Sequence, residues 1–115
     1  MSDPNPYSAE QPERSAIEAM RGPVLLEFGT NWCGHCAAAR PLVETALGAH
    51  AGVRHVKIED GQGRLLGRSF RVKFWPTLVF LRDGEELARV VRPLGTGSIR
   101  AALERIDPPA ADATQ

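Results

Sequence analysis

The feature that most constrains the fold is a short apolar segment, residues 24–28, that is soon followed by a helical pattern over residues 37–47. The segment reads Val-Leu-Leu-Glu-Phe, and a run that is apolar apart from one carboxylate is typical of a strand covered on both faces. Such a strand needs a layer of helices on each side, because both of its faces must be packed. The sequence therefore predicts an α/β domain.

Hydrophobic periodicity and turn residues predict the remaining elements. They are helices over residues 11–20, 64–70 and 97–106 and strands over residues 53–58, 77–81 and 87–91. Asp83-Gly84 predicts a hairpin between the last two strands, and Pro41 is expected to kink the helix over residues 37–47. The predicted order is helix, strand, helix, strand, helix, strand, strand, helix.

The chain contains 115 residues, of which 43% are hydrophobic, and this suffices for one domain with one core. Residues 1–10 carry Pro4 and Pro6, so they are predicted to form an irregular lead-in that could pair only at a sheet edge. A first edge strand is therefore expected to be weak or absent. Residues 11–106 form the predicted domain, and residues 107–115 are predicted to be a disordered tail.

Charge and hydropathy argue against two kinds of partner. Lysine plus arginine balance aspartate plus glutamate at 14 each, so no net charge attracts nucleic acid or an anionic membrane. The N-terminal residues lack a basic segment followed by an apolar one, and no apolar run is long enough to span a membrane. We therefore expect a cytoplasmic protein without a membrane or nucleic-acid partner.

The two cysteines, Cys33 and Cys36, are too close in sequence to staple a fold, so they are expected to serve as a redox or metal-binding pair. Cys33 lies where a helix is predicted to begin, and the unpaired N–H groups at a helix start stabilise a thiolate. Cys33 is the expected nucleophile for disulfide exchange. Cys36, one helical turn later, could attack the resulting mixed disulfide and release the partner.

The motif Trp32-Cys33-Gly34-His35-Cys36, with Pro41 after it and Pro76-Thr77 further on, resembles the thioredoxin family over roughly residues 22–106. The resemblance implies a thioredoxin fold, with a central mixed sheet of about four strands flanked by helices. It also implies a protein-disulfide oxidoreductase, which in a reducing cytoplasm would reduce disulfides of partner proteins. The protein is expected to be a monomer that receives electrons from a reductase or from glutathione. No metal, nucleotide or flavin cofactor is implied.

The family resemblance also suggests which residues bind the partner. Pro76 matches a proline that is cis in the family and faces the active site, and its alternative is an edge-strand proline outside any site. Trp32 and Trp75, with Gly34 and Thr77, could form a docking surface for an extended segment. Packing in the core is expected for the phenylalanines Phe28, Phe74 and Phe80 rather than for either tryptophan.

Two charged residues are candidates for proton transfer. Glu27 stands six residues before Cys33, where thioredoxins usually carry a buried aspartate that relays a proton to or from the second cysteine; the glutamate is a departure in length. A carboxylate at a strand end that reaches solvent is its alternative. Lys57 resembles the family lysine that pairs with this carboxylate, and an ordinary exposed lysine is the alternative.

His35 replaces the proline that general thioredoxins usually carry between the cysteines, and Gly-His at this position resembles protein disulfide isomerases. A histidine beside Cys33 would stabilise the reduced form, which raises the reduction potential. The two family types differ by about 100 mV, or about 4 kcal/mol. The sequence therefore predicts a potential above that of an ordinary thioredoxin.

Partner choice is left open by two further features. Arg92-Pro93 stands where thioredoxins generally have a glycine that lets the substrate backbone approach. A basic stretch without an acidic residue could meet an acidic partner, although a solvated helix face explains it as well; its members are Arg64, Arg68, Arg71 and Lys73.

Two functions of another class compete with disulfide exchange. Zinc could be held by the cysteines with His35, His50 or His55, but these histidines are scattered and no second cysteine pair exists. A thioredoxin-like binding or chaperone module with little redox turnover would use the same docking surface. It would be favoured if the protein captured partners without its cysteines.

Overall fold

The computed structural model describes residues 5–109, and within that range the elements follow the predicted order. They are α1 (Arg14–Glu18), β1 (Pro23–Gly29), α2 (Gly34–Leu47), β2 (Arg54–Glu59), α3 (Leu65–Ser69), β3 (Thr77–Arg82), β4 (Glu85–Val91) and α4 (Gly97–Ile106). The α/β class predicted from the sequence is confirmed.

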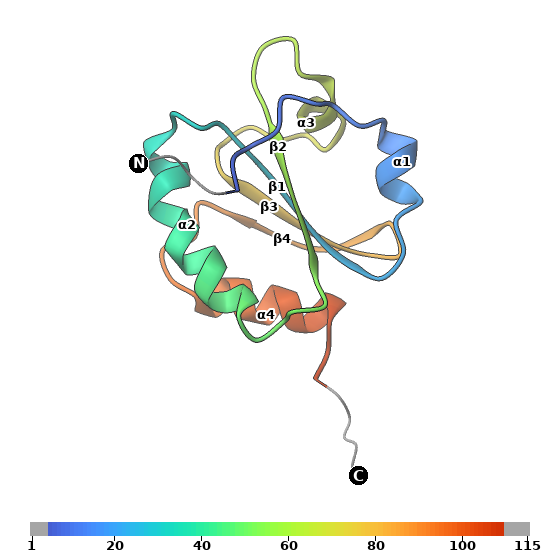
Figure 1. Ribbon diagram of the computed structural model, residues 1–115, viewed down its shortest axis with the longest axis vertical. Coiled ribbons are helices and arrows are strands. Elements are labelled where there is room, and N and C mark those ends of the chain that lie inside the picture. Colours follow the sequence, from blue (N-terminus) through green and yellow to red (C-terminus); the bar gives the residue numbers. More distant parts are fainter. Residues whose placement is uncertain (1–4, 110–115) are drawn as a thin grey trace.

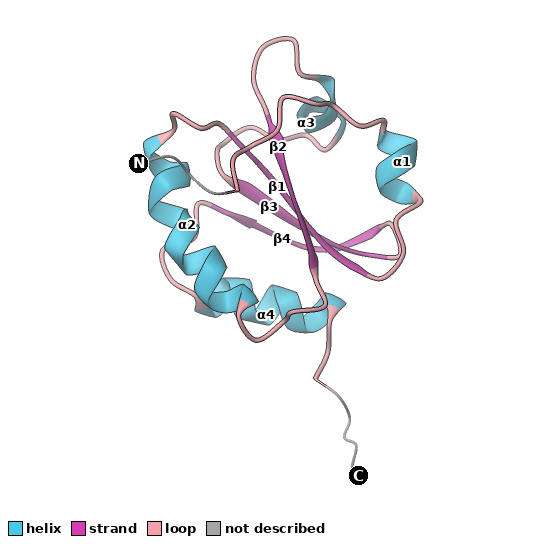
Figure 2. Ribbon diagram, viewed as in Figure 1, coloured by secondary structure: helices cyan, strands magenta, loops and turns pink. Residues whose placement is uncertain are grey.

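The strands form one mixed sheet between two layers of helices (Figure 1). Within the described range, its four strands lie in the order β2-β1-β3-β4, with β1 and β2 parallel and the other neighbours antiparallel. Helices α2 and α4 pack on one face, and α1 and α3 pack on the other (Figure 2). The predicted sheet of about four strands is therefore confirmed.

Strand β1 lies inside the sheet, and its side chains alternate between the two helical layers. Leu25 packs with Phe80 in the core beside α2 and α4, whereas Leu26 and Phe28 pack in the core beside α1 and α3. Glu27 has the same orientation as Leu25, because side chains two residues apart in a strand share a face. The strand thus places one carboxylate in an otherwise apolar layer.

The start of one helix differs from the prediction, and that of another agrees with it. Helix α1 is shorter than the predicted residues 11–20, because Pro12 stays outside its first turn and Glu13 is the N-cap residue. Helix α2 has Cys33 as its N-cap, which confirms the helix start predicted at Cys33, and the helical pattern predicted over residues 37–47 forms its later turns. The first turn of α2 holds the two residues between the cysteines.

The hairpin between β3 and β4 confirms the prediction made from Asp83-Gly84. Both residues have positive φ angles, 52° for Asp83 and 85° for Gly84. Two-residue turns that join twisted antiparallel strands need this backbone conformation at both positions, and aspartate and glycine adopt it most readily. The local sequence therefore determines this turn.

The lead-in follows the outer edge of β2. Ser8 forms an isolated parallel bridge with Ile58. The Ser8 N–H donates to the Lys57 carbonyl at 3.0 Å, and the Glu59 N–H donates to the Ser8 carbonyl at 2.8 Å. This pairing is limited to an edge, in keeping with the weak first strand expected. Residues 1–4 and 110–115 lie outside the described range, so the expectations for Pro4 and for most of the tail stay predictions.

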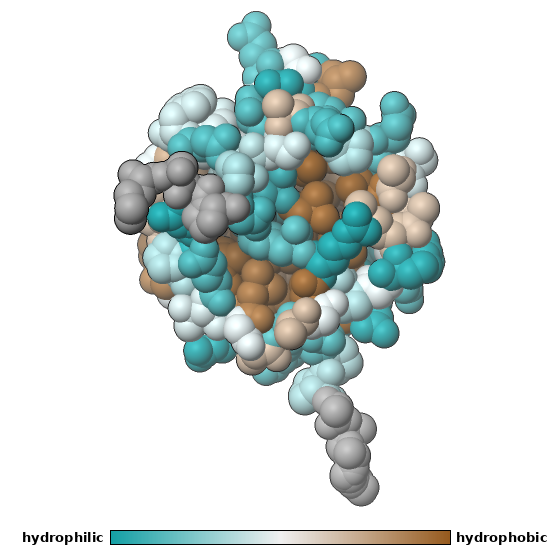
Figure 3. All heavy atoms as spheres, viewed as in Figure 1, coloured by the Kyte–Doolittle hydropathy of each residue, from teal (hydrophilic) through white to brown (hydrophobic). Residues whose placement is uncertain are grey.

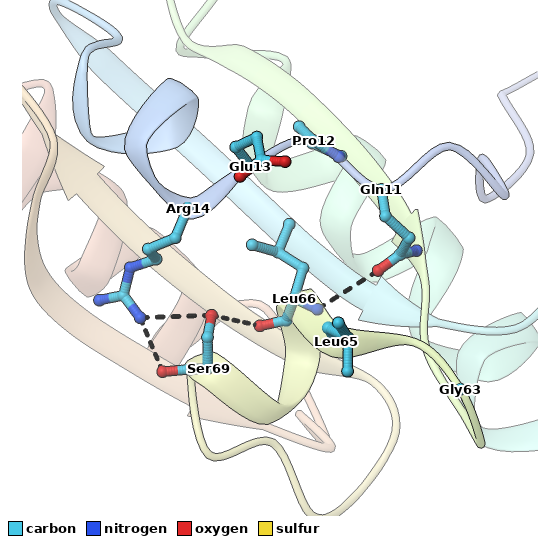
Figure 4. A pocket seen from close by; sticks show the side chains of 8 residues that line it. All are labelled: Gln11, Pro12, Glu13, Arg14, Gly63, Leu65, Leu66 and Ser69. Carbon is cyan, nitrogen blue, oxygen red and sulfur yellow. Dashed lines mark hydrogen bonds between the residues drawn. The ribbon is translucent and has the colours of Figure 1, made fainter.

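The first residue of α1 and the segment before it are hydrogen-bonded to α3 across a hollow of about 280 Å³ (Figure 4). Arg14 Nη1 donates to the Ser69 carbonyl at 2.6 Å, and the Leu66 N–H donates to Gln11 Oε1 at 3.4 Å. The Arg14 guanidinium also lies 3.8 Å from the centroid of the Phe70 ring. These polar groups are paired with each other inside the fold, so their role at the hollow is to join its two sides.

The edge of β2 is covered only in part by this N-terminal segment. Figure 3 shows hydrophobic surface between polar side chains on this face of the molecule. A hollow of about 380 Å³ is lined by Met20, Val56 and Ile58 and by residues of the segment before α1. The lead-in is held to β2 by the Ser8 bridge, and Gln11 and Arg14, which follow it, are hydrogen-bonded to α3.

Candidate functional site

Cys33 is the N-cap residue of α2, where the turn after β1 places it. Its Sγ accepts a hydrogen bond from the Cys36 backbone N–H at 3.3 Å, and its side chain is partly exposed. The first N–H groups of a helix carry partial positive charge and lack partners within the helix, so they favour an anionic sulfur. Gly34 follows, and a Cβ at this position would have no atom within 4 Å. Cys33 is thus the accessible sulfur of the pair.

Cys36 lies one helical turn later and is only 4% exposed. The pKa of its thiol is raised to about 11, first by burial and then by its hydrogen bond with Cys33. Hydrogen bonds from the Thr30 backbone and the Tyr7 hydroxyl oppose this shift. Cys36 is therefore a neutral thiol at pH 7, and it must lose a proton before it can act as a nucleophile.

This difference between the sulfurs predicts unequal alkylation of the reduced protein. With a pKa of about 11, about one Cys36 in ten thousand is a thiolate at pH 7, so iodoacetamide is expected to modify Cys33 first. Between pH 7 and pH 10 the rate at Cys36 should rise about tenfold per pH unit. Timed labelling followed by peptide mass spectrometry measures both rates, and Cys33→Ser isolates the Cys36 rate. Equal rates at pH 7 would contradict the assignment.

Glu27 is 2% exposed, so the alternative of a strand-end carboxylate that reaches solvent is wrong. Its Oε2 accepts a hydrogen bond from the Tyr7 hydroxyl. Its Oε1 lies 2.7 Å from His55 Nε2. A buried carboxylate needs such partners, because an unpaired charge in an apolar layer is strongly destabilising. Tyr7 and His55 are both residues that sequence reasoning had not assigned to Glu27.

Lys57 is 7% exposed, so the alternative of an ordinary exposed lysine is wrong as well. It lies opposite Glu27 in the register between β1 and β2. Its Nζ lies 4.5 Å from the centroid of the Tyr7 ring. Lys57, Glu27 and His55 line a cavity of about 30 Å³ together with Arg40 of α2. A polar cavity of this size can hold a water molecule.

Tyr7 is the site residue that sequence reasoning missed, and it is 6% exposed. The Asn31 side chain holds its backbone from both sides: the Tyr7 N–H donates to Asn31 Oδ1 at 2.8 Å, and Asn31 Nδ2 donates to the Tyr7 carbonyl at 3.2 Å. The available signal was that this is the one tyrosine of the chain, set in a polar segment after Pro6. A large aromatic residue in such a segment usually needs a place to be buried.

Gly29 lets Tyr7 and Cys36 approach the same point. A Cβ at Gly29 would lie 2.6 Å from Cys36 Sγ and 2.7 Å from the Tyr7 hydroxyl oxygen, too close for either atom. Burial, followed by the charge of Glu27, raises the pKa of Tyr7 well above its ordinary value. The phenol is therefore protonated and can act as a neutral hydrogen-bond donor and acceptor.

The second wall of the site is formed by the two tryptophans and the loop before β3. The Trp75–Pro76 peptide bond is cis, and Pro76 and Thr77 are buried. Trp32 is 77% exposed, and its ring meets that of Trp75 edge to face, with centroids 5.7 Å apart. Trp75 Nε1 donates to Asp60 Oδ2 at 2.9 Å. The structure thus brings the predicted docking residues together and leaves an aromatic ring open to solvent.

Arg92 contacts this wall directly. It has a positive φ of 48°, consistent with a position where glycine is usual. Its Nε donates to the Trp75 carbonyl at 2.8 Å, and its guanidinium lies 5.2 Å from the centroid of the Phe74 ring. Phe74 is 55% exposed, so the prediction that it packs in the core is wrong, whereas Phe28 and Phe80 are fully buried as predicted.

The histidines named as candidate metal ligands are separated. His35 is exposed in the first turn of α2, between the cysteines. His50 Nδ1 lies 2.8 Å from Asp107 Oδ2, and His55 contacts Glu27. Among residues 5–109, no group of three or more histidine, cysteine, aspartate or glutamate side chains could hold a metal ion.

The basic stretch near α3 has a local acidic partner. Arg64 Nη2 lies 2.9 Å from Glu59 Oε2, while Arg68, Arg71 and Lys73 are exposed. This arrangement favours the solvated-face explanation over a dedicated acidic-partner surface. Among the described helices, none combines the length and the apolar character needed to cross a membrane.

Two thiols one helical turn apart, one partly exposed at a helix start and the other buried near a carboxylate, define a site for thiol–disulfide exchange. Comparison with known proteins agrees with this class. The Thioredoxin family model matches residues 8–105. The structure of thioredoxin 2 from Pseudomonas aeruginosa PAO1 in its reduced form superposes with a TM-score of 0.81 and 53% identity, covering 90% of this chain and 96% of that one.

Curated relatives agree with the family model. Thioredoxin Asp f 28 of Aspergillus fumigatus is 31% identical, covering 74% of this chain and 76% of its own length. Thioredoxin H2-1 of Oryza sativa subsp. japonica is 27% identical, covering 78% and 77%. The chain belongs to the thioredoxin family, and it is a protein-disulfide oxidoreductase.

Proposed function

We propose that the protein is a cytoplasmic protein-disulfide reductase in which Cys33 attacks the partner and Cys36 completes the exchange. The observation that supports these roles is the contrast between an accessible sulfur at a helix start and a buried, protonated one. Attack by the Cys33 thiolate forms a mixed disulfide and releases one partner sulfur as a thiolate. Cys36 then attacks the Cys33 sulfur and releases the second, so the partner gains the two electrons that the pair loses.

Glu27 is the proposed acceptor of the proton that Cys36 must lose. It is the buried carboxylate of the layer that holds Cys36, and its hydrogen bonds fix its orientation. Lys57 lies opposite Glu27 in the sheet register, and its positive charge is proposed to act on the Glu27 carboxylate. A carboxylate in this position can take a proton in one half of the catalytic cycle and return it in the other.

The partner is proposed to lie along the wall formed by Trp32, Trp75 and Pro76, with Gly34 and Thr77 beside it. The exposed Trp32 ring offers apolar contact area to an extended segment. Arg92 already donates to the Trp75 carbonyl, so a partner must either displace this hydrogen bond or pair with neighbouring backbone groups. We propose that Arg92 narrows the range of partners in this way.

We propose that the protein acts as a monomer and receives electrons from a reductase or from glutathione. Members of its family act on protein disulfides, and a dithiol in a reducing compartment is kept in the reduced form. For a pair with a potential near −180 mV, the reduced form would exceed the oxidised form more than about tenfold at a cytosolic potential of about −230 mV. A histidine that raises the potential is therefore compatible with a reductase.

The first experiment is the equilibrium reduction potential of the Cys33/Cys36 pair in graded glutathione buffers, followed by the fluorescence of Trp32. We expect a value near −180 mV, about 100 mV above a typical thioredoxin, because His35 can stabilise the reduced Cys33. The variant His35→Pro is expected to lower the potential toward about −270 mV.

The matched control is His50→Gln, which changes a histidine paired with Asp107 outside the site. It is expected to leave the potential unchanged. A wild-type value near −270 mV would show that His35 has no such effect. The absence of a reversible dithiol–disulfide transition would overturn the proposed reaction itself.

A further inference from the structure

The hydroxyl of Tyr7 lies between the two groups that the resolving step must connect. It donates a hydrogen bond to Glu27 Oε2. Both it and the Cys36 sulfur lie within 2.7 Å of the point that a Gly29 Cβ would occupy. The contact spans distant parts of the chain, because Tyr7 comes from the lead-in and Glu27 from the strand inside the sheet. The geometry therefore offers a link from the buried thiol to the buried carboxylate.

The position of Tyr7 is closely controlled. Asn31, in the loop that leads to Cys33, makes two hydrogen bonds to the Tyr7 backbone. On the other side, the next residue, Ser8, is hydrogen-bonded to β2. The Tyr7 ring is also covered by Lys57. A side chain held by so many contacts keeps its hydroxyl in one place, which proton transfer requires.

We propose that Tyr7 is the catalytic proton shuttle of the resolving step, an inference that rests on the proposed roles of Cys36 and Glu27. The Cys36 thiol gives its proton to the Tyr7 oxygen while the Tyr7 hydroxyl gives its own proton to Glu27. Tyr7 is then again a neutral phenol, now donating to the Cys36 thiolate. The thiolate attacks the Cys33 sulfur of the mixed disulfide, and the released partner thiolate takes a proton from solvent.

The groups around this path fit such a transfer. The raised pKa of Tyr7 means that the phenol need never carry a charge, because it loses one proton as it gains another. A Tyr7 hydroxyl that donates to Cys36 lowers the pKa of that thiol relative to burial alone. The transfer therefore stabilises the thiolate it creates.

Glu27 in turn has a way to pass the proton to solvent. His55, its other hydrogen-bond partner, has a side chain that is 17% exposed. The small cavity beside the carboxylate is lined by further charged groups, namely Arg40 and Glu44 of α2 and Lys57 of β2. These groups, with Tyr7 and Cys36, are the titratable and charged neighbours that a proton on Glu27 would meet.

The test uses the reduced full-length protein and the aromatic disulfide DTNB, whose two thionitrobenzoate groups are released in successive steps. Attack by Cys33 releases the first, and attack by Cys36 releases the second, so stopped-flow absorbance separates the two rates. Tyr7→Phe keeps the ring and removes the hydroxyl. It is expected to slow the second phase at least about tenfold at pH 7 and to leave the first within about twofold.

A control variant, Ser69→Ala, removes a hydrogen-bonded hydroxyl at the end of α3 and should change neither phase. A proton inventory on the unmodified protein, in mixtures of H₂O and D₂O, is expected to curve because two protons move together. A second phase in Tyr7→Phe within twofold of wild type, or a linear inventory, would overturn the shuttle and leave the proposed function intact. Release of only one group by the wild type would instead overturn the role of Cys36.

Discussion

Cys33→Ser is expected to reduce disulfide reductase activity at least about 1,000-fold, to the background of the assay. A serine hydroxyl is not ionised at neutral pH and does not attack a disulfide, so the variant loses the nucleophile itself. Reduction of insulin disulfides with dithiothreitol as electron source measures the loss. The fold should be unaffected, because Cys33 is a partly exposed N-cap residue and serine is a favourable N-cap.

Cys36→Ser is the matched control that tests which of the two sulfurs attacks the partner first. It retains the nucleophile and loses the resolving thiol, so it is expected to accumulate a covalent mixed disulfide with the partner through Cys33. Trapping by Cys33→Ser instead would reverse the two assignments. If the double variant still captured partner proteins without a covalent bond, a binding module with little redox turnover would be favoured over the reductase.

Phe80→Ala is expected to lower the free energy of unfolding by about 3–5 kcal/mol, as removal of a buried aromatic ring leaves a cavity. Phe80 is fully buried on β3, in the core shared by α2 and α4. Since small domains are stable by only about 5–15 kcal/mol, this loss is a large part of the total. Urea unfolding followed by tryptophan fluorescence measures the change.

Phe74→Ala provides the comparison with the same chemical change at an exposed ring. Phe74 is 55% exposed, and its one described ring contact is with the Arg92 guanidinium at 5.2 Å. Its loss is expected to cost about 1 kcal/mol or less. Similar losses in the two variants would mean that the core beside α2 and α4 does not dominate stability. The pair therefore tests the assignment of the core directly.

The lead-in has more importance for the site than its composition suggested. A domain beginning at residue 11, as predicted from the sequence, would lack both Tyr7 and the Ser8 bridge to β2. Tyr7 supplies a hydroxyl to the buried carboxylate, and Asn31 in the loop before Cys33 holds the Tyr7 backbone. A segment with little regular structure thus completes the site around Cys36.

Arg92, at the other side of the site, likewise has contacts that its place in the sequence did not indicate. Its sequence position indicated only that a glycine was missing, whereas the structure shows its Nε bound to the Trp75 carbonyl. The left-handed backbone at Arg92 is what turns the chain there. The exposed Arg92 side chain is therefore hydrogen-bonded to the Trp75 carbonyl, a backbone group in the wall proposed to bind the partner.

The sequence by itself determined the order of the elements, the hairpin turn and the pair of thiols. Each of these depends on short-range patterns: an apolar run for β1, Asp83-Gly84 for the turn, and a spacing that places Cys33 and Cys36 one helical turn apart. The sequence did not determine where the first helix begins, because Pro12 was compatible with a longer helix that the fold does not form.

Only the tertiary structure decided what surrounds those thiols and the buried carboxylate. Tyr7 and His55 reach Glu27 across separations of 20 and 28 residues, and Arg92 reaches Trp75 across 17. No local periodicity encodes such contacts, since they depend on how strands are ordered and which residues share a face. The physical reason is burial: packing of the sheet excludes water from Glu27 and Cys36, and their partners must then come from whichever segments the fold brings near.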